Sequence, residues 1–305
     1  MDDFPAENVP LNAIPSENYK VFELDNDEKK FLTTETEDRV FSTLHEGAIF
    51  LYLAETFKVL ELNLEEKEVI LKKEDVHYYT EPRYTTNITP LIEDDAGSSP
   101  VVKKGDLPPV KIFDRGEKVD PLKLYYGDVL VEHEYTKYVE LEINTSKIIN
   151  QCPLELPKTS FQTKALWFNI PLEIQVELDE IDKKALGGAI HAVEHGVISL
   201  IPKNVLCSRW DIGGVSIDLD PLYNCAMIYI YDSYPGGIGL VEHAKENIIG
   251  LLKDTLEMIK NCQCKDDSAC PSCCQSPKCG SGNIPISKRG AIKLLSMLLE
   301  NIVSL

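Results

Sequence analysis

Apolar and polar residues alternate in several short runs in the first half of the chain. These runs are YKVFEL at 19–24, GAIFLYL at 47–53, TFKVLELNL at 56–64 and KEVILKK at 67–73. A period of two places every second side chain on the same face of a strand. Because the runs lie close together in the chain, they predict a β-rich unit, arranged as a meander or a small barrel.

Three further segments complete the prediction for the first half. Residues 35–44 predict a short helix with Thr34 as its N-cap, because apolar residues recur on one helical face. Residues 93–109 are rich in Gly, Ser and Pro and predict a flexible loop. Residues 126–145 alternate again and predict a long hairpin that turns near residues 136–137.

The pattern changes from about residue 152 onward, where longer apolar segments appear. Strands are predicted at 164–171, 215–219 and 225–232, and helices at 184–202, 238–261 and 287–303, the last with Ser287 as its cap. The predicted fold class is α+β: a β-rich linking domain over 1–150 is followed by a mixed α/β domain over 151–305.

Charge limits the partners that this chain can have. Lys+Arg number 31 against Asp+Glu 50, which gives a net charge of −19, and the excess belongs to the N-terminal three quarters. So acidic a surface repels phosphate backbones, and we expect at most weak binding of DNA by this chain alone. No segment approaches the roughly 20 apolar residues of a membrane span, and the acidic N-terminus carries no secretory signal. We expect an intracellular protein, in the cytoplasm or nucleus, without a membrane partner.

The segment 262–283 holds six of the nine cysteines, spaced C-x-C-x5-C-x2-C-C-x4-C. Clustered cysteines inside a cell are typical of metal ligands, and four thiolates close a tetrahedral zinc site that leaves no position for water. The favoured ligands of one structural zinc are Cys264, Cys270, Cys273 and Cys279, with Cys262 as the alternate ligand. Cys274 is expected to point away because it directly follows Cys273. An iron–sulfur cluster, a redox pair and free thiols remain open alternatives.

A second candidate site lies in the predicted helix 184–202. His191, Glu194 and His195 match H-x-x-E-H, in which two histidines one turn apart hold zinc and the glutamate acts as general base. This makes a metal-dependent hydrolase the alternative function. The motif fixes only three residues, however, and polar side chains hydrogen-bonded along a packed helix are the favoured explanation.

Two observations concern phosphate binding. YDSYPGG at 231–237 joins a strand to a helix, a geometry that can place helix-terminal amides around an anion, although a turn without ligand is the simpler interpretation. The sequence has neither a Walker A motif nor an acidic DEAD-like box, so ATP is not expected to bind this chain. We do not expect this chain alone to be an enzyme.

Four ordered segments of the second half resemble one known family. They are GGAIHAVEH at 187–195, RWDIGGVS at 209–216, IYDSYPGGIGLVEH at 230–243 and the cysteine-rich stretch from 262 to 295. They are similar to the C-terminal region of the MrfA and Hrq group of superfamily-2 DNA helicases, which includes the MrfA zinc-binding domain. Residues 9–24 and 46–80 are similar to the segment between motor and zinc domain.

The resemblance implies a fold and a function that the residues alone do not. Family members are ATP-dependent 3′ to 5′ helicases of DNA repair whose two RecA-like lobes precede this region, and these lobes are absent here. Carried over, the zinc ligands fall on Cys264, Cys270, Cys273 and Cys279, with Cys262 also matching. The implied function is a zinc-binding module that guides a DNA strand or docks on a helicase motor, in cis or in trans. The implied DNA is single-stranded or forked. A pure interaction module is a third possibility.

Overall fold

The computed structural model describes residues 17–26, 28–91, 111–113, 122–180, 185–265 and 267–302. The contacts within the chain divide it into two compact units, one of residues 1–85 and 133–159, the other of residues 86–132 and 160–305. Each unit therefore draws on two stretches of sequence. The predicted domain boundary near residue 150 stays a prediction. The predicted loop near 93–109 lies outside the described residues.

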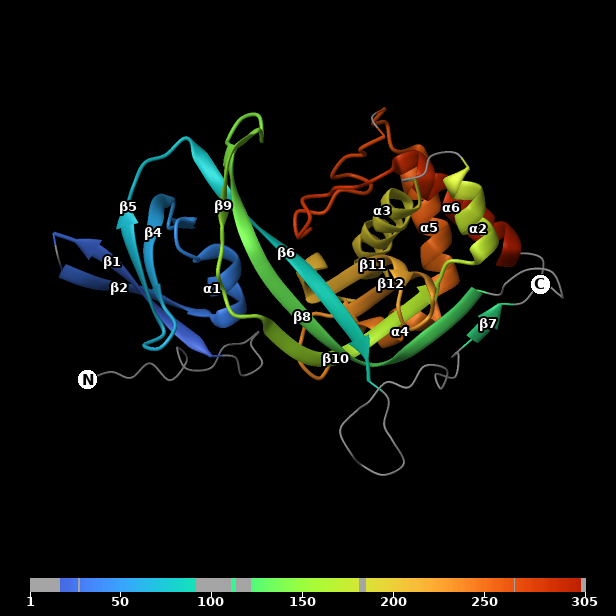
Figure 1. Ribbon diagram of the computed structural model, residues 1–305, viewed down its shortest axis with the longest axis horizontal. Helices are drawn as coiled ribbons and strands as arrows, with labels where there is room; N and C mark the ends of the chain where they lie inside the picture. The colour runs from blue at the N-terminus through green and yellow to red at the C-terminus, as the bar shows by residue number, and fades with distance from the viewer. Residues whose placement is uncertain are drawn as a thin grey trace, which may run out of the picture. The chain divides into compact units, whose positions relative to one another are not determined.

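The first unit contains a mixed five-stranded sheet with the order β2-β1-β5-β4-β3 (Figure 1). Its elements are β1 (Asn18–Asp25), β2 (Glu28–Thr36), α1 (Glu37–Thr43), β3 (Ile49–Tyr52), β4 (Glu55–Asn63) and β5 (Glu68–Lys73). Strands β3, β4 and β5 form an antiparallel meander, and β1 pairs in parallel with β5. Helix α1 buries Val40 and Phe41 in the core beneath this sheet.

The second sheet has the order β11-β12-β10-β8-β6, and β7 and β9 also pair with β8. Its strands are β6 (Tyr78–Pro90), β7 (Lys111–Phe113), β8 (Leu122–Glu142), β9 (Ile148–Pro153), β10 (Thr159–Asn169), β11 (Ile212–Asp220) and β12 (Cys225–Asp232). The β12 bounds are those predicted from its apolar segment. The predicted hairpin at residues 136–137 is wrong, because β8 continues through both. Thr136 and Lys137 lack the turn-forming character of Gly, Asn or Asp.

The helices of the second unit gather beside β11 and β12 (Figure 1). They are α2 (Leu172–Asp179), α3 (Ala185–Leu200), α4 (Leu240–Glu246), α5 (Ile248–Asn261) and α6 (Lys288–Ile302), with short 3-10 turns at Ile201–Lys203 and Arg209–Asp211. Helix α3 contacts α2, α5, α6, β11 and β12, which explains why its sequence is apolar on nearly every side. This central helix carries both histidines of the H-x-x-E-H motif.

One predicted helix is two. The segment 238–261 is interrupted at Asn247, whose φ of −120° and ψ of 27° separate α4 from α5. Ser287 caps α6 as predicted, because its Oγ accepts a hydrogen bond from the Gly290 N–H at 3.0 Å. Together these elements confirm the α+β fold class. No helix in the described part of the chain is long and apolar enough to cross a membrane.

Candidate metal centre

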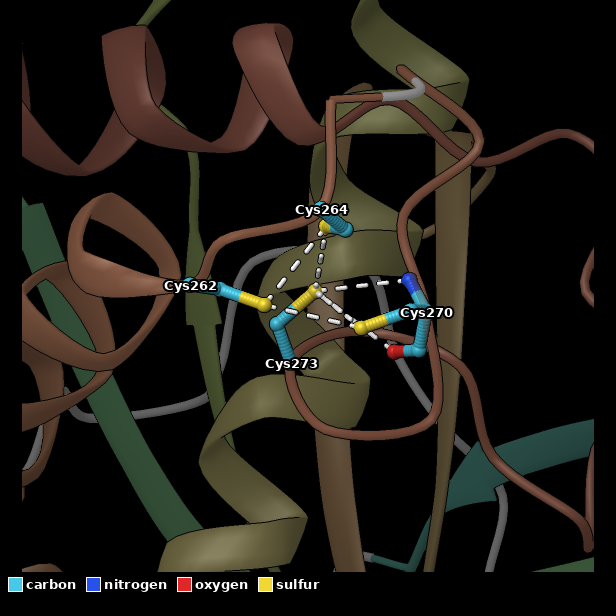
Figure 2. A group of neighbouring side chains, drawn as sticks. All are labelled: Cys262, Cys264, Cys270 and Cys273. Atoms are coloured by element: carbon cyan, nitrogen blue, oxygen red, sulfur yellow. Dashed lines mark hydrogen bonds between the residues drawn. The ribbon is translucent and has the colours of Figure 1, made fainter.

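Four thiols meet where α5 ends. Cys262 is the C-cap residue of α5, Cys264 lies two residues further on, and Cys270 and Cys273 come from the turn that follows (Figure 2). The Sγ–Sγ distances are 3.5 Å for Cys262–Cys264 and Cys262–Cys270, 3.7 Å for Cys264–Cys273 and 3.8 Å for Cys270–Cys273. All four sulfurs lie within 4.8 Å of one another. They surround a single point.

This spacing fits one tetrahedral metal ion. Four thiolates at a Zn–S distance of about 2.3 Å have their sulfurs roughly 3.8 Å apart, close to the distances observed. Disulfides would need about 2.05 Å, and these cysteines are free. Burial raises the pKa of the Cys273 thiol to about 12, so a bound cation is what would hold this thiol as thiolate near neutral pH. The donor set is therefore chemically suited to zinc.

The turn between Cys270 and Cys273 fixes the second pair of sulfurs. The N–H groups of Cys273 and Cys274 both donate to the Cys270 carbonyl oxygen, at 3.0 and 3.1 Å. The Cys270 N–H lies 3.4 Å from the Cys273 sulfur and donates to it. Ala269, just before the turn, has a positive φ of 64°. A backbone N–H aimed at a sulfur stabilises negative charge on it, as a metal-bound thiolate requires.

Lys288 supplies positive charge beside the four cysteines. Its Nζ donates to the carbonyl oxygens of Cys262 and Cys264, both at 2.8 Å, and lies 3.4 Å from the Cys264 sulfur. Asp267 ties the same region to α6, because its carboxylate accepts from the Ser287 hydroxyl and the Arg289 N–H. A Zn²⁺ with four thiolates carries two net negative charges, which a nearby ammonium group partly offsets.

The structure brings together three of the four favoured ligands, Cys264, Cys270 and Cys273. The fourth sulfur of the group is that of Cys262, the alternate ligand of the sequence analysis. Cys279 lies instead beside α3, where it groups with two histidines. Cys274 is fully buried, and its carbonyl oxygen accepts a hydrogen bond from His195.

The two histidines of the H-x-x-E-H motif meet Cys279. The His191 Nε2 is 3.3 Å from the Cys279 sulfur, and the two imidazole rings lie 4.3 Å apart. Burial lowers the pKa of His191, but the hydrogen bond to Cys279, the charges of Glu194 and Cys279 and the hydrogen bond to the Pro285 carbonyl together outweigh it and raise this pKa to about 9. Burial likewise raises the pKa of Cys279, but the hydrogen bonds and the charges of His191 and His195 together lower it to about 4. Without a metal, this is an imidazolium–thiolate pair.

Glu194, the third residue of the motif, has a different environment. Its side chain is buried and packs against β11, where a Cβ added to Gly214 would meet its Cγ at 2.9 Å. Burial raises the pKa of Glu194 above the usual value of a glutamate. A general base facing a substrate needs access to an open cleft, which this packing does not provide.

In the turn between β12 and α4, the carboxylate of Asp232 occupies the position where a bound anion would lie. The Asp232 Oδ2 accepts from the N–H groups of Ile238, Gly239 and Leu240 at 2.7, 2.9 and 3.3 Å, and Oδ1 accepts from Val241 at 3.0 Å. These are the amides at the start of α4 that a phosphate would need. The simpler interpretation of YDSYPGG is therefore the one that the structure favours, and Asp232 positions the helix.

The comparisons with known proteins agree with the assignment of the four cysteines to a zinc site. A family model described as the MrfA Zn-binding domain matches residues 193–274, a segment that contains all four clustered cysteines. An uncharacterized protein of Methanocaldococcus jannaschii is 40% identical over 114 residues, which is 36% of this chain and 100% of that protein. The site thus belongs to a zinc-binding class of domain.

Longer similarities extend beyond the zinc-binding segment. A Bacillus subtilis protein named as the ATP-dependent helicase YprA is 26% identical over 274 residues, 89% of this chain and 33% of that protein. The crystal structure of helicase MrfA bound to DNA matches with a TM-score of 0.58 and 24% identity, covering 99% of this chain and 36% of MrfA. The chain spans about a third of the length of these helicases.

The chain belongs to the MrfA zinc-binding-domain family and resembles the C-terminal part of MrfA-type helicases.

Proposed function

We propose that this chain is a zinc-stabilised accessory module of an ATP-dependent DNA helicase, to which it contributes docking or strand guidance but no ATPase activity. One structural zinc is bound by Cys262, Cys264, Cys270 and Cys273. The motor is supplied in cis or in trans. An intracellular location, in the cytoplasm or nucleus, is part of the proposal.

One observation carries this proposal. Almost the whole chain, 99% of it, matches a part of MrfA that makes up 36% of that helicase. A solved MrfA complex contains DNA, so the matching region of MrfA belongs to a DNA-bound protein. The hydrolase alternative is not favoured, since these relatives are helicases and Glu194 is packed away from any open cleft.

The zinc centre has a mechanical consequence for such a module. The four cysteines connect the end of α5 to the chain that leads into α6, and Lys288 and Asp267 add further links between them. Zinc supplies a crosslink when bound, and the energy of binding becomes energy of folding. A module that docks on a helicase motor or guides a DNA strand needs the segment between α5 and α6 to be held in one conformation.

A reconstitution in trans tests the function. The partner is the motor of a MrfA-type helicase truncated to its RecA-like lobes, and the substrate is fluorescently labelled forked DNA over a salt series. We expect the chain alone to bind DNA weakly, because its net charge is −19, and to hydrolyse no ATP. Added to the motor, it should increase the affinity for forked DNA at least severalfold.

Cys270→Ser is the matched variant, since it should lose the stimulation together with the zinc. Cys207→Ser, which changes a cysteine outside both metal-competent groups, should behave as wild type. If the chain leaves DNA binding and unwinding by the motor unchanged, the accessory role is refuted. ATP hydrolysis by the purified chain would refute the assignment of all ATPase activity to the motor.

A further inference from the structure

The grouping of His191, His195 and Cys279 stands apart from the four-cysteine centre. The two histidines lie one turn apart on α3, and Cys279 comes from the segment between the cysteine turn and α6. The ligand atoms of the three residues all lie within 4.8 Å of one another, and none belongs to the other group. The family match at residues 193–274 includes neither His191 nor Cys279.

The orientation of both rings is fixed by backbone carbonyl groups. The His191 Nδ1 lies 2.6 Å from the Pro285 carbonyl oxygen, and the His195 Nδ1 lies 2.7 Å from that of Cys274. A carbonyl oxygen only accepts hydrogen bonds, so each Nδ1 carries a proton. This leaves the Nε2 atom of each ring as the one that can bind a metal. Metal-binding histidines characteristically donate their other N–H in this way.

The Cys279 sulfur is surrounded by hydrogen-bond donors. The Asn283 N–H donates to it at 3.2 Å, and the Ser281 hydroxyl lies 3.2 Å away. Donors of this kind stabilise a thiolate, which is the form that binds metal. These contacts hold Cys279 as the thiolate that binds metal, and a bound ion would take the place of the proton on the His191 Nε2.

We propose that His191 Nε2, His195 Nε2 and Cys279 Sγ bind a second divalent ion of the zinc class. With Zn–N near 2.05 Å and Zn–S near 2.3 Å, a tetrahedral ion places the nitrogen and sulfur about 3.6 Å apart. The 3.3 Å between His191 Nε2 and Cys279 Sγ is close to this value. Mixed imidazole and thiolate ligands suit zinc better than magnesium or calcium.

The second ion would fasten the segment 274–285 to α3. Gly188 already allows a close approach there, because a Cβ on it would meet the Ser287 N at 3.1 Å, and its carbonyl oxygen accepts from that N–H. The two centres are thus consecutive crosslinks: the first joins α5 to the cysteine turn, and the second joins the following segment to α3. The inference does not depend on the helicase role, since it concerns metal binding only.

Metal content of the full chain tests the proposal. The protein is prepared reduced, without an affinity tag that binds metals, dialysed against trace Zn²⁺ and measured by elemental mass spectrometry. We expect two zinc ions per chain. Cys279→Ser and His191→Ala should each hold one, and Cys270→Ser should lose the other. The matched controls Cys207→Ser and His243→Ala, the latter on the exposed face of α4, should keep two.

A measurement on the unaltered chain covers the case in which a variant does not fold. Replacement of zinc by ¹¹³Cd should give two NMR resonances, one with the shift of a four-sulfur site and one with that of a mixed nitrogen and sulfur site. A single four-sulfur resonance, with one metal per chain and an alkylatable Cys279 thiolate in the metal-loaded protein, would overturn the second site. The three residues would then be only a hydrogen-bonded pair and its neighbour.

Discussion

Asp232→Asn isolates the energetic role of the Asp232 carboxylate, which accepts hydrogen bonds from the amides at the start of α4. Asparagine has almost the same shape, but it can present an oxygen to only one side of the site. In the native protein Oδ2 accepts from three backbone N–H groups and Oδ1 accepts from the Val241 N–H. With the amide oxygen in the place of Oδ2, the amide NH₂ faces the Val241 N–H, and two donors oppose each other.

The magnitude follows from these contacts. One hydrogen bond to a charged acceptor is lost, at about 1.5–3 kcal/mol, and one buried N–H is left unpaired, which places the cost at the upper part of this range or above it. Loss of the negative charge at the helix start contributes about 0.3–1 kcal/mol more. We expect Asp232→Asn to lower the free energy of unfolding of the second unit by about 3 kcal/mol.

Urea unfolding followed by tryptophan fluorescence measures this change, because Trp167 is buried in the sheet of the second unit. Free zinc is held constant so that metal loss does not contribute. Asp254→Asn is the control: its carboxylate forms an exposed ion pair with Lys203, and its loss should cost about 1 kcal/mol or less. If Asp232→Asn costs no more than this control, the explanation of the YDSYPGG turn is refuted.

Two other predictions concern single side chains. Lys288→Met keeps the length of the side chain but removes the ammonium group beside the Cys264 sulfur, and should weaken zinc binding roughly tenfold in a chelator competition, whereas Lys293→Met on the same helix should not. In the first unit, burial lowers the pKa of His45, whose Nε2 has no hydrogen-bond partner among the described residues. The unfolded chain therefore takes up the proton first, and stability should fall as the pH drops below about 6.5, by at most about 1.4 kcal/mol per pH unit. His45→Gln should flatten this dependence; an unchanged slope in urea titrations from pH 7.5 to 5.5 would contradict the assignment.

The hydrophobic pattern was sufficient to predict an element wherever the burial of that element matched the pattern of its sequence. The continuous apolar run of β12 and the largely apolar sequence of α3 predicted strand and helix correctly, since β12 is buried on both faces of the sheet and α3 is surrounded by other elements. It failed at residues 136–137, where no turn-forming residue was present, and at Asn247, where one helix became two. Strand β2 was missed because its charged residues and threonines do not alternate clearly.

The choice of metal ligands could be predicted from the sequence only in part. Spacing identified a group of thiols, but the choice between Cys262 and Cys279 depends on where α3 lies, and chain separation does not encode that position. Cys279 is 88 residues from its partner His191, so only the folded unit brings them together. The H-x-x-E-H spacing was the available signal, although it suggested a glutamate base instead of a cysteine ligand.

The most direct test of the central claim is the zinc content of Cys270→Ser against wild type, measured together with thermal unfolding of each protein at equal free zinc. The account predicts the loss of one zinc per chain and a large drop in the melting temperature of the second unit, because a metal bound only by the folded state stabilises it. The first unit should unfold as before, since it contains none of the four cysteines. A variant that keeps the wild-type zinc content and melting temperature would contradict the account.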